Sequence, residues 1–211
     1  MRVEPIRSEA EIIRIEDTLF NLDTVRGDRM FVMFEVGIHM GMRIGDMLEL
    51  RVGDIRGKDY YEFDPQKTRT HKNIINYKAK HLRLPVAATL RKMVSEMYKG
   101  QDDDAYLLQS HKGGAISRQQ AWRDMQEIKR LCGVKQNIGC HTLRKTFGYH
   151  VYRRTKDVAA LQEWFQHSTQ EMTLIYIGIR DDERRALTDS MSVGDRGRLD
   201  YVGKRKREQK G

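Results

Sequence analysis

The sequence has only two cysteines and no long apolar segment. Cys132 and Cys140 form no CxxC pair, and their position near an expected helix end does not suggest a disulfide scaffold. No apolar run approaches the roughly 18 residues that a membrane span needs. The N-terminal sequence MRVEPIRSEAEIIRIED carries acids early and lacks the apolar core of a secretory leader. We therefore expect a cytoplasmic protein with reduced thiols and no membrane partner.

Motifs of nucleotide hydrolysis and of metal catalysis are also missing. Gly37, Gly41 and Gly45 recur at intervals of four, but no GxxxxGK[ST] sequence occurs in the chain. The seven histidines form no HExxH motif, and no Cys/His cluster has the spacing of a zinc site. We expect neither a nucleotide-driven motor nor a metal centre, and no cofactor.

The charge of the chain is strongly positive but unevenly distributed. The 211 residues carry a formal net charge of +9, which favours a polyanionic partner. From Arg196 onward there are seven basic and two acidic residues, a net of +5. We interpret 193–211 as a basic, disordered tail that contacts phosphates or, alternatively, only keeps the chain in solution. Net charge alone is thus weak support for nucleic-acid binding.

Hydrophobic periodicity predicts a mainly α domain with a small antiparallel β-sheet over residues 1–192. Helices are expected at 8–22, 28–41, 44–50, 90–100, 117–133, 142–152, 157–165, 169–175 and 182–191. Strands are expected at 60–63, 74–75 and 82–84, and a brief extended segment at 106–108. Ser8, Asp28 and Ser117 are the expected N-caps of their helices, and VGDI at 52–55 is expected to turn the chain towards the sheet.

Cationic and proton-carrying residues recur in four short segments. Arg43 stands at the start of a short helix in GMRIGDML, and Lys67 lies at a strand–loop edge. In HTLRKTF, His141 and Arg144 are three residues apart, which puts both on one helical face. His167 and Tyr176 are nine residues apart and bracket a turn and a short helix. Taken singly, each is an ordinary surface or packing residue, so only the combination is informative.

These segments resemble the boxes of the tyrosine recombinase, or phage integrase, catalytic domain. The first arginine box of that family looks like G-[LM]-R-I-[GS]-[DE]-[LM]-L, and the second is similar to HxLRxTF. The third resembles a GH dipeptide followed nine residues later by tyrosine, here from Gln166-His167 to Tyr176. The correspondence spans about residues 5–190 and keeps the family's order.

The resemblance implies the DNA breaking-rejoining fold and site-specific recombination of double-stranded DNA through a covalent 3′-phosphotyrosyl intermediate. It implies an integrase of a mobile element. The chemistry of the side chains agrees, because forked guanidiniums neutralise a pentacoordinate phosphorane and a phenol oxygen can form a resealable phosphodiester. The implied roles are Arg43 and Arg144 as charge stabilisers, Tyr176 as nucleophile, His141 as base, Lys67 as acid and His167 as a donor to a non-bridging oxygen.

Three departures from the family pattern stand out. Lys67 precedes Pro85 by eighteen residues, farther than the family's hairpin lysine does, so either the hairpin is long or Lys78 is the acid. Gln166 replaces a glycine, which is expected to leave that backbone less free to approach phosphate. The family's preceding helical domain is missing, so we expect a fragment or a reduced form that binds DNA weakly.

Two surfaces are candidates for intermolecular contact. Arg118, Gln119 and Arg123 on one helix are candidates for groove contacts, although an ordinary polar helix face would look the same. The resemblance implies a homo-tetramer that forms on DNA from monomers. The helix at 182–191, with Leu187 and Met191, would then dock on a neighbouring protomer or pack on its own domain.

Two other functions remain open on the sequence. A type IB topoisomerase would use the same residues but would only relax supercoils. A non-catalytic DNA-binding module would keep the charge without the chemistry, so its properties would not depend on the Tyr176 hydroxyl.

Overall fold

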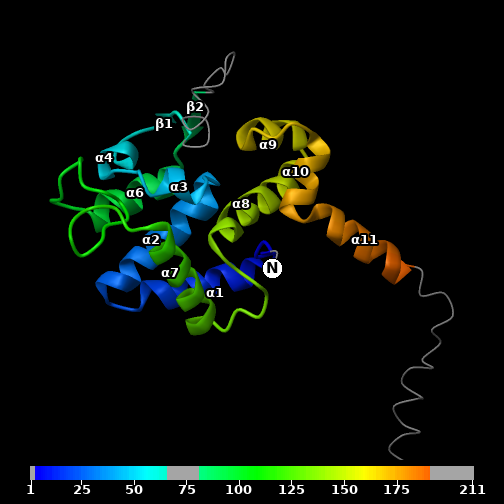
Figure 1. Cartoon of the computed structure of the whole chain (residues 1–211), viewed down its shortest axis with the longest axis horizontal. Coiled ribbons are helices and arrows are strands. Elements are labelled where there is room, and N and C mark those ends of the chain that lie inside the picture. The colour runs from blue at the N-terminus through cyan, green and yellow to red at the C-terminus, as the bar shows by residue number, and fades with distance from the viewer. Residues whose placement is uncertain (1–2, 66–80, 191–211) are drawn as a thin grey trace, which may run out of the picture.

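Helices make up most of the chain that the structure describes. The computed structural model describes residues 3–65 and 81–190 (Figure 1). Its helices are α1 (Glu9–Phe20), α2 (Val25–Met40), α3 (Ile44–Met47), α4 (Val52–Ile55), α6 (Ala88–Met97), α7 (Arg118–Leu131), α8 (Cys140–Thr155), α9 (Val158–Phe165), α10 (Gln170–Ile177) and α11 (Ile179–Ser190). None of these is long and apolar enough to cross a bilayer.

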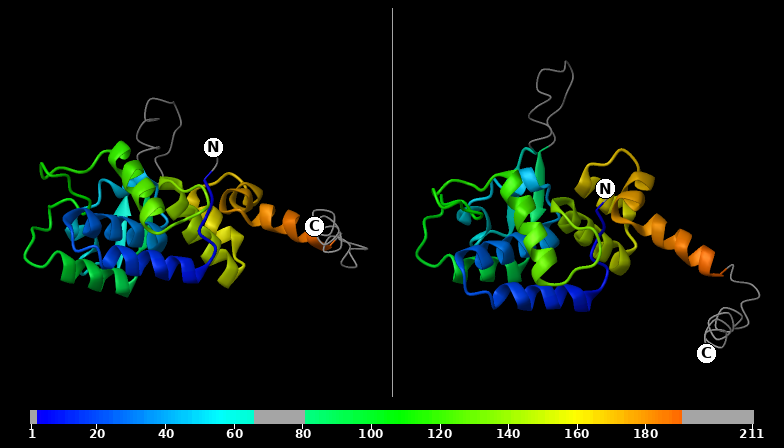
Figure 2. Two further views of the ribbon diagram at one scale, coloured as in Figure 1. Left: turned by 90° about the horizontal axis from the view of Figure 1, so that it is seen from below. Right: turned by 60° about the horizontal axis from the view of Figure 1, so that its bottom comes forward.

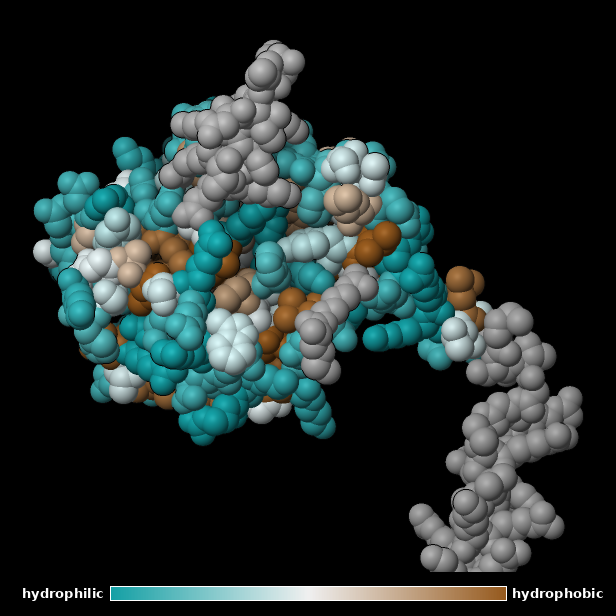
Figure 3. Space-filling model, in the orientation of Figure 1, coloured by the Kyte–Doolittle hydropathy of each residue, from teal (hydrophilic) through white to brown (hydrophobic). Residues whose placement is uncertain are grey.

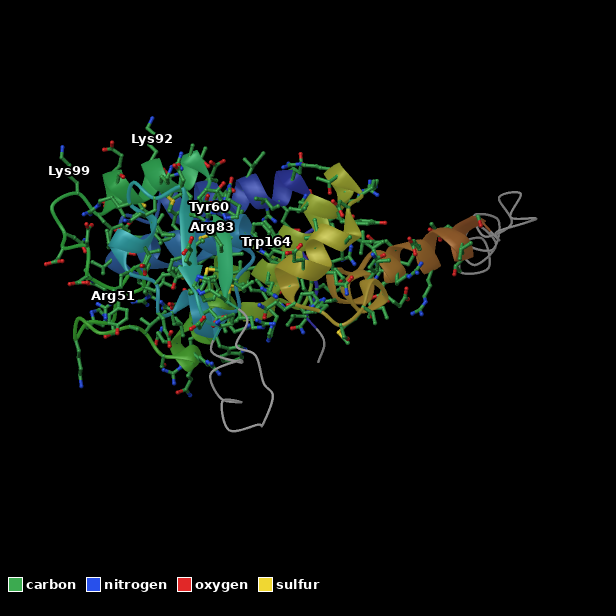
Figure 4. All side chains as sticks on the ribbon, turned by 90° about the horizontal axis from the view of Figure 1, so that it is seen from above. Arg51, Tyr60, Arg83, Lys92, Lys99 and Trp164 are labelled. Atoms are coloured by element: carbon green, nitrogen blue, oxygen red, sulfur yellow. The ribbon has the colours of Figure 1, made fainter. Side chains whose placement is uncertain are left out.

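A two-stranded antiparallel sheet joins β1 (Tyr60–Phe63) to β2 (Leu82–Pro85), which confirms the expected mainly α fold with a small sheet. Tyr60 lies opposite Pro85 in the register. The Arg83 guanidinium covers the Tyr60 ring at 3.8 Å, and the two side chains lie together on the sheet in Figure 4. The third expected strand, at 74–75, lies outside the described residues.

Two local expectations are wrong. The second helix begins a turn earlier than Asp28, because Thr24 is its N-cap and accepts from the Gly27 amide at 2.9 Å. The VGDI segment is itself a helix, α4, rather than a turn. Its first turn is fixed by the Asp54 carboxylate, which accepts from the Arg51 amide at 2.8 Å. The expected extended segment at 106–108 is present as a bridge between Tyr106 and Arg51.

The buried side chains form two clusters that meet at α8. The larger cluster lies among α1, α2, α6 and α7 and includes Leu143 of α8. The smaller one joins Phe147 of α8 to Phe165 of α9 and Ile177 of α10. Helices α2 and α8 approach closely at Gly37, where a β-carbon would lie 2.5 Å from Leu143 Cδ1. Helix α8 is thereby packed against both clusters through its residues 142–149.

The last helix, α11, projects away from the rest of the molecule (Figures 1 and 2). Its base is tied to the N-terminal segment by an ion pair between Arg7 and Asp182, with 3.0 Å between Nε and Oδ1. Farther out, Leu187 is 66% exposed, and Figure 3 shows apolar surface towards this end. Met191 and the expected tail at 193–211 lie outside the described residues. The intramolecular contact of α11 is therefore at its base, and docking on a neighbour stays a proposal.

Candidate active site

Two arginines from distant parts of the chain meet at one backbone carbonyl. Arg43 precedes α3 and donates from Nη2 to the carbonyl oxygen of Phe165 at 3.2 Å. Arg144 on α8 donates from Nη2 to the same oxygen at 3.1 Å and from Nη1 to the Gly41 carbonyl at 2.6 Å. The Phe165 carbonyl oxygen accepts from both guanidiniums and so holds the two positive charges side by side.

Packing fixes the Arg144 guanidinium in place. The residue is 5% exposed, and its guanidinium carbon lies 4.2 Å from the centre of the Phe165 ring. Burial lowers the pKa of Arg144, and the positive charge of Arg43 lowers it further, whereas Tyr176 and Asp46 raise it. The resulting pKa still leaves the guanidinium charged at neutral pH. The site thus holds a preorganised pair of positive charges.

The Tyr176 hydroxyl lies at the edge of this pair. It is 3.4 Å from Nδ1 of His141, and the Tyr176 ring meets the rings of Phe165 and His167 edge to face at 5.6 and 5.1 Å between centroids. Burial raises the pKa of Tyr176, while Arg144 and Arg43 oppose that shift. The phenol is therefore protonated at neutral pH and needs a base to become a nucleophile.

His141 meets the requirements of such a base. It lies in the first turn of α8, one turn before Arg144 on the same helix. Burial lowers the pKa of His141, and the charges of Arg144, Lys145 and Arg43 lower it further. A neutral imidazole has one nitrogen that can accept the phenol proton.

His167 is held by the turn that ends α9. Gln166 has a left-handed backbone with φ +53°, and the His167 amide donates to the Gln162 carbonyl at 3.0 Å. The Gln162 side chain donates back to the His167 carbonyl at 3.1 Å. A non-glycine residue in this conformation costs about 1–2 kcal/mol, so these hydrogen bonds hold a turn that glycine would form more easily. The substitution of glycine by Gln166 has not prevented the turn.

A cavity of about 410 Å³ opens beside His167. It lies between α9, which contributes Glu163, and the start of β2, which contributes Leu82 and the preceding His81. His81 is paired with Asp64 at 3.2 Å, across the segment 66–80. The stem of the hairpin therefore faces the turn that carries His167.

Sequence comparison identifies the family. The phage integrase family model matches residues 10–183. The chain belongs to the phage integrase family. It is 37% identical over 185 residues to the probable integrase/recombinase YoeC of Bacillus subtilis, covering 87% of this chain and 94% of that protein. It is 24% identical over 176 residues to the tyrosine recombinase XerH of Campylobacter jejuni, covering 80% of this chain and 46% of the relative.

Solved structures of other family members share the fold. The crystal structure of XerA recombinase matches with a TM-score of 0.66 and 20% identity, over 91% of this chain and 67% of that one. The catalytic domain of bacteriophage HP1 integrase matches with a TM-score of 0.56 and 16% identity, over 92% of this chain and 98% of that one. The expected tyrosine recombinase catalytic-domain fold is thus confirmed.

Most of the residues singled out from the family boxes lie together in the structure. The ones that converge are Arg43, His141, Arg144, His167 and Tyr176. Lys67 and its alternative Lys78 lie outside the described residues. Arg118, Gln119 and Arg123 are exposed on the first two turns of α7, which a role in DNA contact requires. The roles of all these residues stay predictions.

Sequence reasoning overlooked two side chains at this site. Lys145 is nearly buried, donates to the Val3 carbonyl at 2.9 Å and places its ammonium 5.2 Å from the Tyr176 ring. Its place directly after Arg144 in the second box could have drawn attention to it. Thr173 contacts His167, but a threonine inside a helix gives no sequence signal of its own.

Proposed function

We propose that the chain is a tyrosine-type site-specific DNA recombinase, which attacks a backbone phosphorus with the Tyr176 hydroxyl. The observation that carries this proposal is the meeting of Arg43 and Arg144 at the Phe165 carbonyl, beside a phenol and two imidazoles. The relatives named integrase or tyrosine recombinase support it. DNA is the substrate that this cationic site and those relatives favour.

The two arginines stabilise the pentacoordinate phosphorus. A guanidinium offers five N–H donors, and the hydrogen bonds described above use one from Arg43 and two from Arg144. We assign remaining donors of both arginines to the non-bridging oxygens, where negative charge grows during attack. His167 donates a further hydrogen bond to one of these oxygens.

Proton transfer accompanies both bond changes. His141 takes the phenol proton as the Tyr176 oxygen bonds to phosphorus, and the 5′ oxygen leaves with a proton from Lys67 or Lys78. The product is a 3′-phosphotyrosyl ester that keeps the phosphodiester energy, so a 5′ hydroxyl of another strand can reverse the step without ATP.

Assembly on DNA follows from the same proposal. Solved complexes include XerH bound to its difH substrate and a dimer of lambda integrase bound to a core site. For this chain we propose monomers that assemble as a homo-tetramer on double-stranded DNA, with Arg118, Gln119 and Arg123 near the groove. A structural neighbour is the integrase of the Tn1549 transposon, and YoeC is named a probable integrase/recombinase; on this ground we propose a role in a mobile element.

A nicked suicide duplex tests the chemistry. The parent chain should form a covalent protein–DNA adduct that survives a denaturing gel, and EDTA should not change its yield. Tyr176→Phe should abolish the adduct, whereas Tyr106→Phe, whose ring contacts Arg51, should keep it. An adduct from Tyr176→Phe would refute the proposed nucleophile. A parent chain that forms no adduct, and that Tyr176→Phe matches in every assay, would instead favour a DNA-binding module.

The arginines have their own test with a matched control. Arg43→Ala or Arg144→Ala should lower the rate of adduct formation by roughly 100-fold or more, because each removes a preorganised donor worth about 3 kcal/mol. Arg153→Ala removes an exposed arginine from the last turn of α8 and should leave the rate unchanged. Strand exchange between two duplexes, rather than relaxation of a supercoiled plasmid alone, would separate a recombinase from a type IB topoisomerase.

A further inference from the structure

A buried hydroxyl controls one nitrogen of the His167 ring. Nδ1 of His167 lies 3.0 Å from Oγ1 of Thr173, and Thr173 has no exposed surface. The same Oγ1 lies 3.2 Å from the carbonyl oxygen of Thr169, one turn earlier on the chain. Both contacts of the hydroxyl are therefore fixed by α10 and by the turn before it.

The protons on the Thr173 hydroxyl and on the His167 ring decide whether Nε2 of His167 can donate a hydrogen bond. A threonine hydroxyl has one proton, and in a helix that proton is commonly donated to the carbonyl four residues back. The Thr173 oxygen is then an acceptor, so the proton of a neutral His167 ring lies on Nδ1. Nε2 of that neutral ring carries a lone pair and cannot donate to a phosphate oxygen.

We propose that Thr173 is a positioning residue that lets His167 donate to the scissile phosphate only as a doubly protonated imidazolium. This inference rests on the proposed function, in which His167 contacts a non-bridging oxygen. It makes His167 a third positive charge beside the two guanidiniums, rather than a neutral donor. Adduct formation then requires a protonated His167 and a neutral His141 at the same pH.

Several charged groups surround the ring and influence its protonation. Tyr176 packs edge to face against it from α10, and Glu163 of α9 and His81 before β2 line the same cavity. Arg43 and Arg144 approach from the other side of the turn, through the Phe165 carbonyl. The Glu163 carboxylate favours the protonated His167 ring, whereas the two guanidiniums disfavour it. The position of the ring proton is therefore best measured by a method that detects that proton directly.

Nitrogen-15 NMR of the histidine-labelled full chain, without DNA, tests the tautomer directly. At a pH where the rings are neutral, the His167 signals should be those of the Nδ1–H tautomer, and His167→Gln identifies them by their loss. Thr173→Ser keeps the hydroxyl and should keep this tautomer. Thr173→Val, which has the same shape without the acceptor, should move the proton to Nε2. An Nε2–H ring in the parent, or the same tautomer in Thr173→Val, would overturn the proposal.

The pH profile of adduct formation extends the test to the reaction. The parent should show a bell, with an acid limb from His141 and an alkaline limb, of about tenfold per pH unit, from loss of one proton by His167. Thr173→Ser should reproduce both limbs. Thr173→Val should lose the alkaline limb of His167 and keep only the fall at higher pH where the acid lysine loses its proton. Unchanged limbs in Thr173→Val would contradict the inference. Absence of any adduct would instead refute the proposed function, and the NMR result would still stand.

Discussion

Replacing Gly41 with alanine would test how tightly the two arginine segments are packed together. Gly41 ends α2 with φ +58°, a left-handed conformation that glycine adopts freely. A β-carbon there would lie 2.3 Å from Cδ1 and 2.7 Å from Cγ of Phe147. The Gly41 carbonyl also accepts from Arg144, so a shift of this residue would disturb the site as well as the core.

Two costs add up in Gly41→Ala. Left-handed backbone costs a non-glycine residue about 1–2 kcal/mol, partly offset by the smaller entropy of the unfolded chain. Overpacking costs about 1–3 kcal/mol more, because the Phe147 ring is wedged against Trp164 at 5.0 Å and Phe165 at 6.2 Å between centroids. We expect the free energy of unfolding to fall by about 2–4 kcal/mol and Tm by roughly 5–15 °C.

Gly57→Ala is the matched control. Gly57 has φ +66°, but no heavy atom would lie within 4 Å of its β-carbon. This variant therefore pays only the backbone cost, about 1 kcal/mol or less. Urea denaturation of both variants gives the difference. Equal losses in the two would refute the argument from close packing, and a Gly41→Ala chain that forms adduct at the parent rate would show that the carbonyl does not position Arg144.

Two further perturbations probe buried charge. Asp124→Asn should lower the free energy of unfolding by about 3–5 kcal/mol in urea denaturation, because the fully buried carboxylate is the ion-pair partner of the nearly buried Arg29; a loss under about 1 kcal/mol would contradict this. Burial and the charge of Glu16 raise the pKa of Glu35 to about 8. The parent should therefore lose stability as the pH rises from about 4.5 to 8, because the unfolded chain ionises this carboxyl in that range while the folded chain keeps it protonated. Glu35→Gln should flatten that decline in thermal denaturation, and parallel curves for both chains would disprove it.

Local signals in the sequence predict most helices well. The Ser8 and Ser117 hydroxyls accept from the amides three residues on, as their spacing predicts. Asp28 is not the N-cap, because the helix begins four residues earlier, where the Thr24 side chain accepts from the Gly27 amide. The α4 helix depends on distant partners, since the Val52 amide donates to the Ala105 carbonyl at 2.9 Å. A pairing between segments so far apart leaves no periodic pattern.

The candidate site residues can be picked out from the sequence, but the contacts that hold them together cannot. Arg43, His141, Arg144, His167 and Tyr176 follow from the order and spacing of three short boxes. The two arginines are held mainly by hydrogen bonds to backbone carbonyls, such as that of Phe165. Every amino acid has a carbonyl oxygen, so the residue type at the end of α9 cannot predict that two guanidiniums meet there.

The site lies on a seam between the two buried clusters. Arg43 belongs to the side of the larger cluster, whereas His167 and Tyr176 are carried by α9 and α10, which pack through the smaller one. Besides the arginine hydrogen bonds, the Trp164 indole donates across the seam to the Met40 carbonyl at 3.0 Å. These hydrogen bonds from Arg43, Arg144 and Trp164 all end on backbone carbonyls. A change along the seam can therefore separate the nucleophile from its charge stabilisers while both clusters stay folded. Substitutions along the seam should therefore lower activity more than stability. Substitutions deep in either cluster should instead lower stability more than activity.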